Sequence, residues 1–236
     1  MRPADSVTLP IVLEAILLDL DGTLYRQTPV RTGMSLRLAR HILFHPITGV
    51  RTARFLRAYR IAQEELRTAN LSSGGEAQMR RACARISIPE SEAQRLIEHW
   101  MQTLPLDLIV KAARPGLRSF LEAATARGIR LGIVSDYPAE EKLAALDIRH
   151  HFSVVVSAAD GEVRRFKPAP DGIHAAVRAL GIEISKAVYV GDRPGVDAEA
   201  ARRAGIASVI MADNKHLASD VPVVESFADL QRLLAI

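Results

Sequence analysis

The stretch AILLDLDGTL, residues 15–24, indicates the fold. It begins with an apolar run from Ala15 to Leu20 that includes Asp19, and it continues through Asp21 and Gly22. A short apolar run that ends in turn-forming residues is typical of a buried strand in a parallel sheet. Side chains two positions apart on an extended chain point to the same side, so we expect the Asp19 and Asp21 carboxylates to face the same way. Gly22 lets the backbone turn immediately after them.

Like charges at the end of a buried strand need a compensating cation. Burial makes neighbouring carboxylates costly unless a metal ion or a lysine neutralises them. Carboxylate oxygens are the ligands that hard ions such as Mg²⁺ prefer, often together with a substrate phosphate. A surface turn or a helix N-cap would also use aspartates here, since Asp-Gly pairs are common in turns. The apolar run before the acids and the Gly-Thr pair after them favour a cation site.

The rest of the chain alternates short apolar runs with helical patterns, except between residues 26 and 113. Such alternation is typical of βα units, which build a parallel sheet covered by helices. We therefore predict an α/β fold with a Rossmann-like, three-layer core around a central parallel sheet. The expected strands are 15–20, 129–134, 152–156, 187–190, 206–211 and 221–224, and the expected helices are 115–127, 138–146, 170–180, 195–204 and 226–234.

Residues 26–113 show helical periodicity without a convincing strand. This division predicts a core domain made of residues 1–25 and 114–236, and an inserted all-α cap domain made of residues 26–113. Because α/β sheets bind ligands beyond the carboxyl ends of their strands, an insert that leaves the end of the first strand should lie over the site as a lid. Within the insert we expect helices at 34–44, 48–69, 75–87 and 89–104, and a flexible loop at 72–75.

Further segments carry side chains that could complete the site. Ser135 ends a predicted strand, where its hydroxyl could bind an anion, or where it or Asp136 could cap the next helix. Lys167 precedes a proline, which favours extended backbone, and its ammonium could neutralise the acids and a phosphoryl group. Asp192 and Asp197 would diverge on a continuous helix, but the Pro-Gly pair between them allows a turn that brings them together. Asp197 would equally suit the first turn of a helix.

In this order, DLDGTL, Ser135 after a hydrophobic strand, Lys167 in FKPAPDG, and GDRPGVD resemble the four motifs of the haloacid dehalogenase-like (HAD) hydrolase superfamily. The resemblance covers residues 15–24 and 115–210. The helical insert between the first and second motifs is similar to the C1-type cap of phosphoglycolate phosphatase-like members. The strand order of the family implies that the strands bearing Ser135 and Asp192 flank the strand bearing Asp19, which brings the motifs to one rim.

The resemblance implies phosphoryl transfer through an aspartyl-phosphate, with Asp19 as nucleophile and Asp21 as general acid and base. Ser135 and Lys167 would stabilise the charge on the phosphoryl oxygens. An acid at the Asp21 position accompanies phosphatases and phosphomutases in this superfamily, so dehalogenation is disfavoured. The resemblance implies a Mg²⁺ site made of Asp19, Asp21 through its backbone carbonyl, Asp192, and Asp197 acting through water or as a supporting partner.

One position departs from the family pattern. Asp136 stands where many members have asparagine, and it adds negative charge near the expected phosphate site. Either its side chain points away as a helix cap, or a more cationic substrate or a second basic contact is expected.

Composition narrows the class of protein. The 236 residues are 48% hydrophobic and 25% charged, with 31 Lys and Arg against 27 Asp and Glu, which is typical of a globular protein. Residues 26–114 hold 15 basic and 7 acidic side chains. The arginines Arg51, Arg54, Arg57 and Arg60 recur there at helical spacing, which indicates either a solvated helix face or a surface for an anionic substrate, a membrane or nucleic acid.

Cysteine and histidine usage adds little chemistry. Cys83 is the single cysteine, so it forms no internal disulfide, and a packed thiol in a cytoplasmic protein is the simplest interpretation. The apolar run near the N-terminus is too short to cross a bilayer, and it lacks the cleavage pattern of a signal peptide. We interpret the pairs His41 with His45 and His150 with His151 as structural, because no third ligand has suitable spacing.

The sequence thus favours a Mg²⁺-dependent phosphatase of a small phosphorylated metabolite. A phosphomutase of the same superfamily is the main alternative, because the same intermediate could pass to a second hydroxyl group. A binding module that uses the Arg-rich insert on nucleic acid or an anionic surface is less favoured, since all the catalytic positions are present. We expect no membrane partner and no nucleic-acid partner. The particular substrate and the oligomeric state are not set by the sequence.

Overall fold

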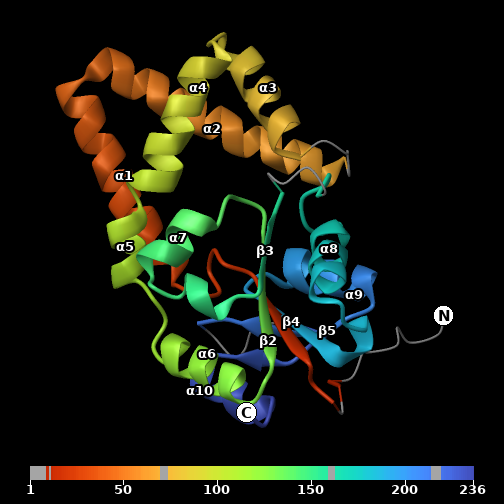
Figure 1. Cartoon of the computed structure of the whole chain (residues 1–236). Helices are drawn as coiled ribbons and strands as arrows, with labels where there is room; N and C mark the ends of the chain where they lie inside the picture. Colours follow the sequence, from red (N-terminus) through yellow and green to blue (C-terminus); the bar gives the residue numbers. More distant parts are fainter. Residues whose placement is uncertain (1–8, 11, 70–73, 159–162, 214–218) are drawn as a thin grey trace.

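A six-stranded parallel sheet forms the centre of the molecule (Figure 1). The computed structural model describes residues 9–10, 12–69, 74–158, 163–213 and 219–236. The strand order is β3-β2-β1-β4-β5-β6, and each neighbouring pair is parallel. This confirms the predicted α/β fold and the flanking of the first strand. The strands are β1 (Ala15–Leu18), β2 (Arg130–Ser135), β3 (Val154–Ser157), β4 (Ala187–Gly191), β5 (Ala207–Met211) and β6 (Val223–Val224).

Alternate residues of β1 pack into cores on opposite faces of the sheet. Ile16 and Leu18 belong to a cluster with α6, α7 and α10, whereas Ala15 and Leu17 belong to a cluster with α8 and α9. An extended strand that is buried on both faces produces this alternation, and the result is the predicted three layers. The helices of these layers are α6 (Leu117–Ala126), α7 (Glu140–Ala145), α8 (Asp171–Leu180), α9 (Glu199–Ala204) and α10 (Phe227–Leu233).

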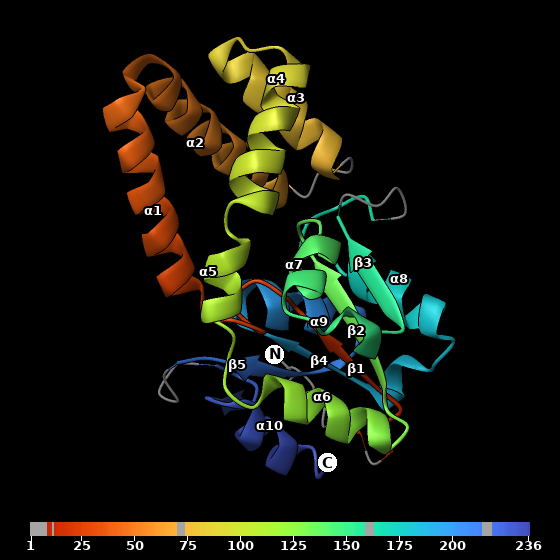
Figure 2. The ribbon, with the colours of Figure 1, turned by 60° about the vertical axis from the view of Figure 1, so that its left-hand side comes forward.

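Helices α1 to α5 follow one another between β1 and β2, and we call residues 27–111 the helical segment. Figures 1 and 2 show α1 to α4 beyond one end of the sheet. These helices have a small core of their own, in which Phe55, Tyr59 and the thiol of Cys83 are buried. The cysteine is thus a packed residue, as predicted. The bounds are α1 (Gln27–Phe44), α2 (Pro46–Thr68), α3 (Gly74–Ile86), α4 (Glu90–Ile97), a π-helical turn that continues α4 (Glu98–Thr103), and α5 (Leu106–Lys111).

The start of α3 corrects one prediction. The flexible loop predicted at 72–75 is wrong in its second half, because α3 begins at Gly74, while Ser72 and Ser73 lie outside the described residues. The Gly74 N–H donates to the Arg164 carbonyl at 2.9 Å. A Cβ atom at Gly74 would lie 2.7 Å from the carbonyl oxygen of Ala158, which is part of the core beneath the helix. This close approach to the core fixes the start of the helix.

The histidine pairs contact other rings. The His41 ring lies 5.3 Å from the His45 ring and 5.3 Å from the Trp100 ring, and the His150 and His151 rings are 4.2 Å apart. In the part of the chain that the structure describes, the cluster with metal-ligand geometry contains aspartates alone. The structural interpretation of both pairs stays a prediction. None of the helices that the structure describes has the length and apolar character needed to span a membrane.

Candidate active site

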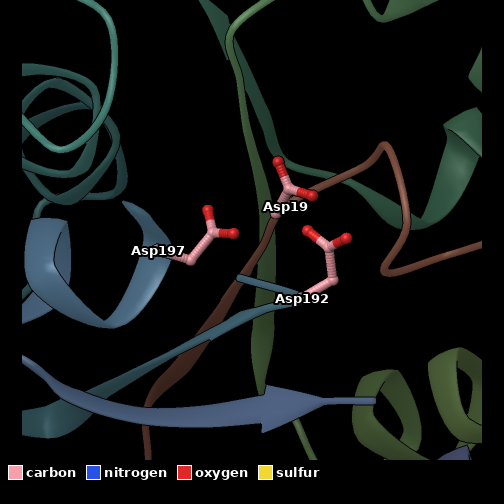
Figure 3. A group of neighbouring side chains, drawn as sticks. All are labelled: Asp19, Asp192 and Asp197. Carbon is pink, nitrogen blue, oxygen red and sulfur yellow. The ribbon is translucent and has the colours of Figure 1, made fainter. Parts of the chain in front are cut away.

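Three carboxylates converge at the carboxyl ends of β1 and β4 (Figure 3). Asp19 follows β1, Asp192 follows β4, and Asp197 lies in a π-helical turn (Pro194–Ala198) that leads into α9. One oxygen from each carboxylate lies within 4.8 Å of the others. The strand ladder continues into the site, since the Asp19 N–H donates to the Val190 carbonyl at 2.8 Å. The structure thus brings together acids that are more than 170 residues apart in the sequence.

Two glycines allow these acids to approach closely. Gly22 has a φ of +107°, and a Cβ atom there would lie 2.1 Å from Asp192 Oδ2. At Gly191, a Cβ atom would lie 2.3 Å from the Asp197 Cβ. A side chain at either position would displace an acid from the cluster. Sterics therefore require the glycine of DLDGTL and the glycine of GDRPGVD.

Lys167 lies among the acids and offsets part of their charge. Its Nζ donates to Asp19 Oδ1, to Asp197 Oδ1 at 2.7 Å and to the Tyr189 hydroxyl at 2.9 Å. Only 4% of the Lys167 side chain is exposed. Thr23 Oγ1 donates to the second Asp19 oxygen at 3.1 Å. The lysine that the sequence offered as a neutralising group therefore contacts two of the three acids directly.

Burial governs the protonation of this cluster. Loss of water raises the pKa of Asp19 to about 8, although Lys167 opposes the shift. Burial also raises the pKa of Asp192 to about 6, and repulsion from Asp197 adds to it. For Asp197 the contact with Lys167 outweighs burial, so its pKa lies below the ordinary value. Burial favours neutral Lys167, but Asp19 and Asp197 outweigh it and hold the lysine pKa well above its ordinary value.

The distribution of hydrogen bonds separates the acids into two kinds. Both oxygens of Asp197 already accept hydrogen bonds. Its Oδ1 accepts from Lys167 and Tyr189, and its Oδ2 accepts from the Arg193 N–H at 3.0 Å. Asp192 Oδ1 is buried and has no hydrogen-bond partner among the described residues. A buried carboxylate oxygen without a donor is costly, and a cation would satisfy it. The all-carboxylate donor set fits a hard divalent ion held by Asp19 and Asp192.

The Asp21 side chain is not part of this cluster, and it contacts a lysine that the sequence analysis missed. Lys142 Nζ, in α7, donates to the two Asp21 oxygens at 2.6 and 2.9 Å, and the Tyr25 hydroxyl donates to Oδ1. Burial raises the pKa of Asp21, but Lys142 and Tyr25 outweigh it and leave that pKa below the ordinary value. The Asp21 backbone carbonyl accepts from Gln27 Nε2 at 3.1 Å.

Ser135 ends β2, the neighbour of β1 in the sheet. Its Oγ accepts a hydrogen bond from the Tyr137 N–H at 3.1 Å. The helix-cap alternative for Ser135 and Asp136 is wrong, because the N-cap of α7 is Ala139 and no side chain caps that helix. Ser135 is buried at the rim where the other motifs meet.

Asp136 connects the core to the helical segment. Its Oδ2 pairs with Arg67 of α2 at 2.8 Å, and its Oδ1 accepts from the Lys167 N–H at 3.0 Å. The Arg67 Nε also donates to the Lys167 carbonyl at 2.7 Å. Only 8% of the Arg67 side chain and 8% of the Asp136 side chain are exposed. Of the possibilities raised by this departure from the family, the second basic contact is the one observed.

A cavity of about 1510 Å³ lies between the acids and the helical segment. Asp19 and Asp21 line it from the core, and Arg57, Arg60 and Gln63 line it from α2. Part of the arginine face that the sequence identified is therefore turned to the site. A concave space that joins apolar walls to a few polar groups is typical of a small-molecule site.

A family model for the haloacid dehalogenase-like hydrolases matches residues 13–205. The chain belongs to this family. The match covers both ends of the acidic cluster and the Lys167 loop, so the resemblance read from the four motifs is confirmed.

Curated relatives match this HAD-family chain over part of their length. A phosphoserine phosphatase of Thermus thermophilus is 36% identical over 98 residues, which cover 40% of this chain and 39% of the relative. A phosphoglycolate phosphatase of Rhodospirillum rubrum is 30% identical over 123 residues, which cover 52% of this chain and 49% of the relative. The chain therefore spans less than half the length of each of these relatives.

Solved structures share the whole fold at low identity. A 2-haloacid dehalogenase from Pseudomonas syringae has a TM-score of 0.65 at 20% identity, covering 95% of this chain and 99% of that one. A predicted phosphoglycolate phosphatase from Haemophilus somnus has a TM-score of 0.57 at 21% identity, covering 94% and 97%. Because proteins named as dehalogenases and proteins named as phosphatases share this fold, the fold alone does not choose the reaction.

Proposed function

We propose that this HAD-family chain is a Mg²⁺-dependent phosphatase that hydrolyses the phosphate ester of a small metabolite. The observation that carries the proposal is the contact of Lys167 with Asp19 and Asp197 beside Asp192 Oδ1, which is buried and accepts no hydrogen bond from the described residues. This arrangement offers a nucleophile, a cation and a metal site within one cluster. The names of the phosphoserine and phosphoglycolate phosphatases among its relatives support the same reaction class.

Asp19 is the proposed nucleophile. Its carboxylate oxygen attacks phosphorus in line with the ester oxygen, so that an aspartyl-phosphate forms as the ester P–O bond breaks. Asp21, which lines the same cavity, gives a proton to the departing oxygen. The dianionic phosphate of the substrate favours that protonated form by like-charge repulsion. Asp21 then takes a proton from water, and the water oxygen attacks phosphorus, releases inorganic phosphate and restores Asp19.

The remaining residues balance charge. Lys167 and Ser135 are proposed to stabilise the phosphoryl oxygens, where negative charge accumulates. Asp19, Asp192 and the backbone carbonyl of Asp21 would hold the Mg²⁺, and Asp197 would support it indirectly. When bound, the ion supplies positive charge that offsets the carboxylates and the phosphoryl group.

The acid at position 21 favours an ester substrate over a haloacid. An alkoxide leaving group needs a proton, whereas a halide leaves as a stable anion. Asp21 lines the cavity, and its contact with Lys142 fixes the position from which it would transfer a proton to a leaving oxygen.

We also propose that residues 26–113 act as a cap domain over a core made of residues 1–25 and 114–236. Residues of α1, α2 and α4 line the cavity that Asp19 and Asp21 close from the other side. A lid of this kind excludes water from the reacting phosphoryl group.

Phosphate release from a panel of phosphate esters, with and without Mg²⁺, tests the proposed function. Wild-type protein should release phosphate only with the metal, and Asp19→Asn should lower kcat by roughly 10³-fold or more. Asp147→Asn, with 80% of its side chain exposed, is the matched control and should retain activity. Full Mg²⁺-dependent turnover by Asp19→Asn would contradict the proposal. Conversion of one sugar phosphate isomer into another without phosphate release would assign the mutase reaction instead.

A further inference from the structure

One face of α2 carries a polar group that nothing in the described part of the chain satisfies. Tyr59, Gln63 and Arg67 are spaced four residues apart, so they lie in a row along the helix. Arg67 is paired with Asp136 at 2.8 Å. Gln63 Oε1 accepts from the Tyr137 hydroxyl, whereas Gln63 Nε2 is buried without a hydrogen-bond partner among the described residues.

The unpartnered amide belongs to the wall of the cavity. Gln63 and Tyr137 both line it, together with Asp21, and only 4% of Gln63 is exposed. A buried donor that lacks an acceptor costs roughly 1–3 kcal/mol, so such groups are rare unless a ligand or water completes them. A ligand or a water in the cavity would supply the acceptor that the Gln63 amide lacks.

A short chain of contacts joins this amide to the proposed proton donor. The Tyr137 hydroxyl contacts Gln63, and the Lys142 Nζ lies 5.8 Å from the centre of the Tyr137 ring. The same Nζ donates to Asp21 at 2.6 Å. One aromatic ring thus separates the amide from the place where the ester oxygen departs. A group on the leaving alcohol, rather than the phosphate itself, would reach Gln63.

The helix that carries the amide also carries a positive charge without an ion-pair partner among the described residues. Arg60 precedes Gln63 by one helical turn, lines the cavity, and forms no ion pair with the described acids. Glu64, on the same helix, is already paired with Arg67. Of the other acids that the helical segment adds to the cavity wall, Glu76 of α3 pairs with Arg80, and Glu90 and Glu98 belong to α4 and its π-helical continuation. An N–H donor beside an unpaired guanidinium selects an anionic oxygen.

We propose that Gln63, Tyr137 and Arg60 form a subsite for the leaving group of the substrate, and that this leaving group carries an anionic oxygen group, either a carboxylate or a second phosphate. The inference rests on the proposed phosphatase function and names its substrate class. Gln63 donates to the anionic oxygen, Tyr137 holds the amide in place, and Arg60 supplies the charge.

A series of matched esters tests this subsite by their kcat/KM values. The series contains 2-phosphoglycolate, ethane-1,2-diyl bisphosphate, ethyl phosphate and phosphoethanolamine. These esters share a phosphorylated two-carbon chain and differ at its second carbon, which is a carboxylate carbon in the first and carries a phosphate, only hydrogen or an ammonium group in the others. Wild-type protein should prefer at least one of the two anionic esters to ethyl phosphate by roughly tenfold or more, and should disfavour the ammonium ester. The better of the two anionic esters identifies the group that is bound.

Variants in α2 locate the preference. Gln63→Leu and Arg60→Met should each lower the ratio of anionic to ethyl ester by roughly tenfold, and Gln63→Glu should shift the preference toward phosphoethanolamine. Arg54→Met is the matched control, because Arg54 is an exposed residue of the same helix outside the cavity, and it should leave the ratio unchanged.

The outcomes separate the subsite from the reaction. Equal turnover of all four esters, with loss of activity in Asp19→Asn, would overturn the subsite and leave the phosphatase function standing. A strong anionic preference that survives in both Gln63→Leu and Arg60→Met would also overturn it. Absence of any Asp19-dependent ester hydrolysis would overturn both proposals.

Discussion

Lys142 and Asp21 make the contact on which the proposed acid–base chemistry of the site depends. Both Asp21 oxygens accept from one ammonium, so the carboxylate is fixed in position as well as in charge. The Lys142 side chain is buried, and its Nζ contacts Asp21 and also lies 5.8 Å from the centre of the Tyr137 ring. A lysine in this place is a positioning residue, since it acts through Asp21.

Replacing this lysine should damage catalysis more than binding. In Lys142→Met we expect kcat to fall by roughly 10- to 100-fold with a smaller change in KM, because Asp21 loses its fixed geometry. Burial is then less opposed, so the Asp21 pKa rises and the limb of the pH–rate profile that reports it moves to higher pH. Steady-state kinetics between pH 5 and 9 measure both effects.

Two further variants serve as controls for the Lys142→Met experiment. Lys142→Arg should recover part of the lost kcat, because a guanidinium can also reach a carboxylate with two donors. Lys186→Met removes a lysine that pairs with Glu14 at 2.9 Å away from the site, and it should be neutral for turnover. An unchanged pH–rate profile in Lys142→Met would disprove the assigned role.

Metal affinity should depend on pH in a way that the buried acids dictate. The pKa of Asp19 is raised to about 8 and that of Asp192 to about 6, in each case mainly by burial. Because a divalent ion binds the ionised carboxylates, it must displace a proton from Asp19 below pH 8 and a second from Asp192 below pH 6. Mg²⁺ affinity should therefore weaken about tenfold per pH unit from 8 to 6, and more steeply below.

Calorimetric titration in buffers of different ionisation enthalpy would measure the Mg²⁺ affinity and the released protons together. A Mg²⁺ affinity that is flat between pH 6 and 8 would show that Asp19 is ionised throughout.

The same pKa shifts affect the stability of the metal-free protein. Asp19 and Asp192 bind protons more tightly in the folded protein than in the unfolded protein. The free energy of unfolding that they contribute should therefore decline as the pH rises from 4 toward 8.

At the scale of single elements, the last turn of α2 attaches the helical segment to the core. Arg67 contacts Asp136 and the backbone carbonyl of Lys167, and both charged side chains are almost fully buried. Buried pairs are sensitive to loss of one partner, because the other is left charged without solvent. The attachment thus contacts both backbone polar groups of Lys167, because the Lys167 N–H also donates to Asp136.

A double-mutant cycle would measure this attachment. Arg67→Met and Asp136→Asn should each lower the free energy of unfolding by about 3 kcal/mol, and the double variant should lose less than the sum by at least about 1 kcal/mol. Urea unfolding provides the values. The exposed pair of Arg80 and Glu76 at 3.4 Å is the matched control, with an expected coupling below about 0.5 kcal/mol. Additive losses at Arg67 and Asp136 would mean that the pair does not act as a unit.

The sequence predicted most elements, and its errors have local causes. Short apolar runs identified the buried strands, and flanking proline and glycine identified the ends of several helices. Helix α5 (Leu106–Lys111) was missed because six residues are too few to show a helical period. The first part of α1, from Gln27 to Gly33, was missed because it has no apolar periodicity. Its residues are mostly polar, and only Val30 is buried. The acids at strand ends were predictable, but Lys142 and Arg67 meet them only through packing between distant elements.

The whole molecule gathers its acids by strand order. Placing β2 and β4 on either side of β1 brings Ser135, Asp19 and Asp192 to one rim, and the family's motifs were sufficient to predict that. The cavity was not predictable, because its shape depends on how α1, α2 and α4 stand over the rim (Figure 2). The identity of the substrate therefore depends on packing that no single motif encodes.

Binding of the metal should stabilise the entire fold. Three acids from two loops lie within 4.8 Å of one another, so an ion that binds them tightens both strand ends. At a hundredfold excess over Kd, Mg²⁺ should add about 2.7 kcal/mol to the free energy of unfolding, which corresponds to a rise in Tm of roughly 5–10 °C. Differential scanning calorimetry measures it. Asp192→Asn should remove most of the rise, and an equal rise in that variant would place the ion elsewhere.

Along α2, the turn that holds the helix to the core ends at Arg67, and the turn that faces the leaving group ends at Gln63. Attachment to the core and contact with the leaving group thus use separate stretches of one helix. An enzyme engineer could therefore replace Arg60 and Gln63 for a new ester while keeping Arg67 and its contacts with the core, and the phosphoryl chemistry beneath would carry over to the new compound.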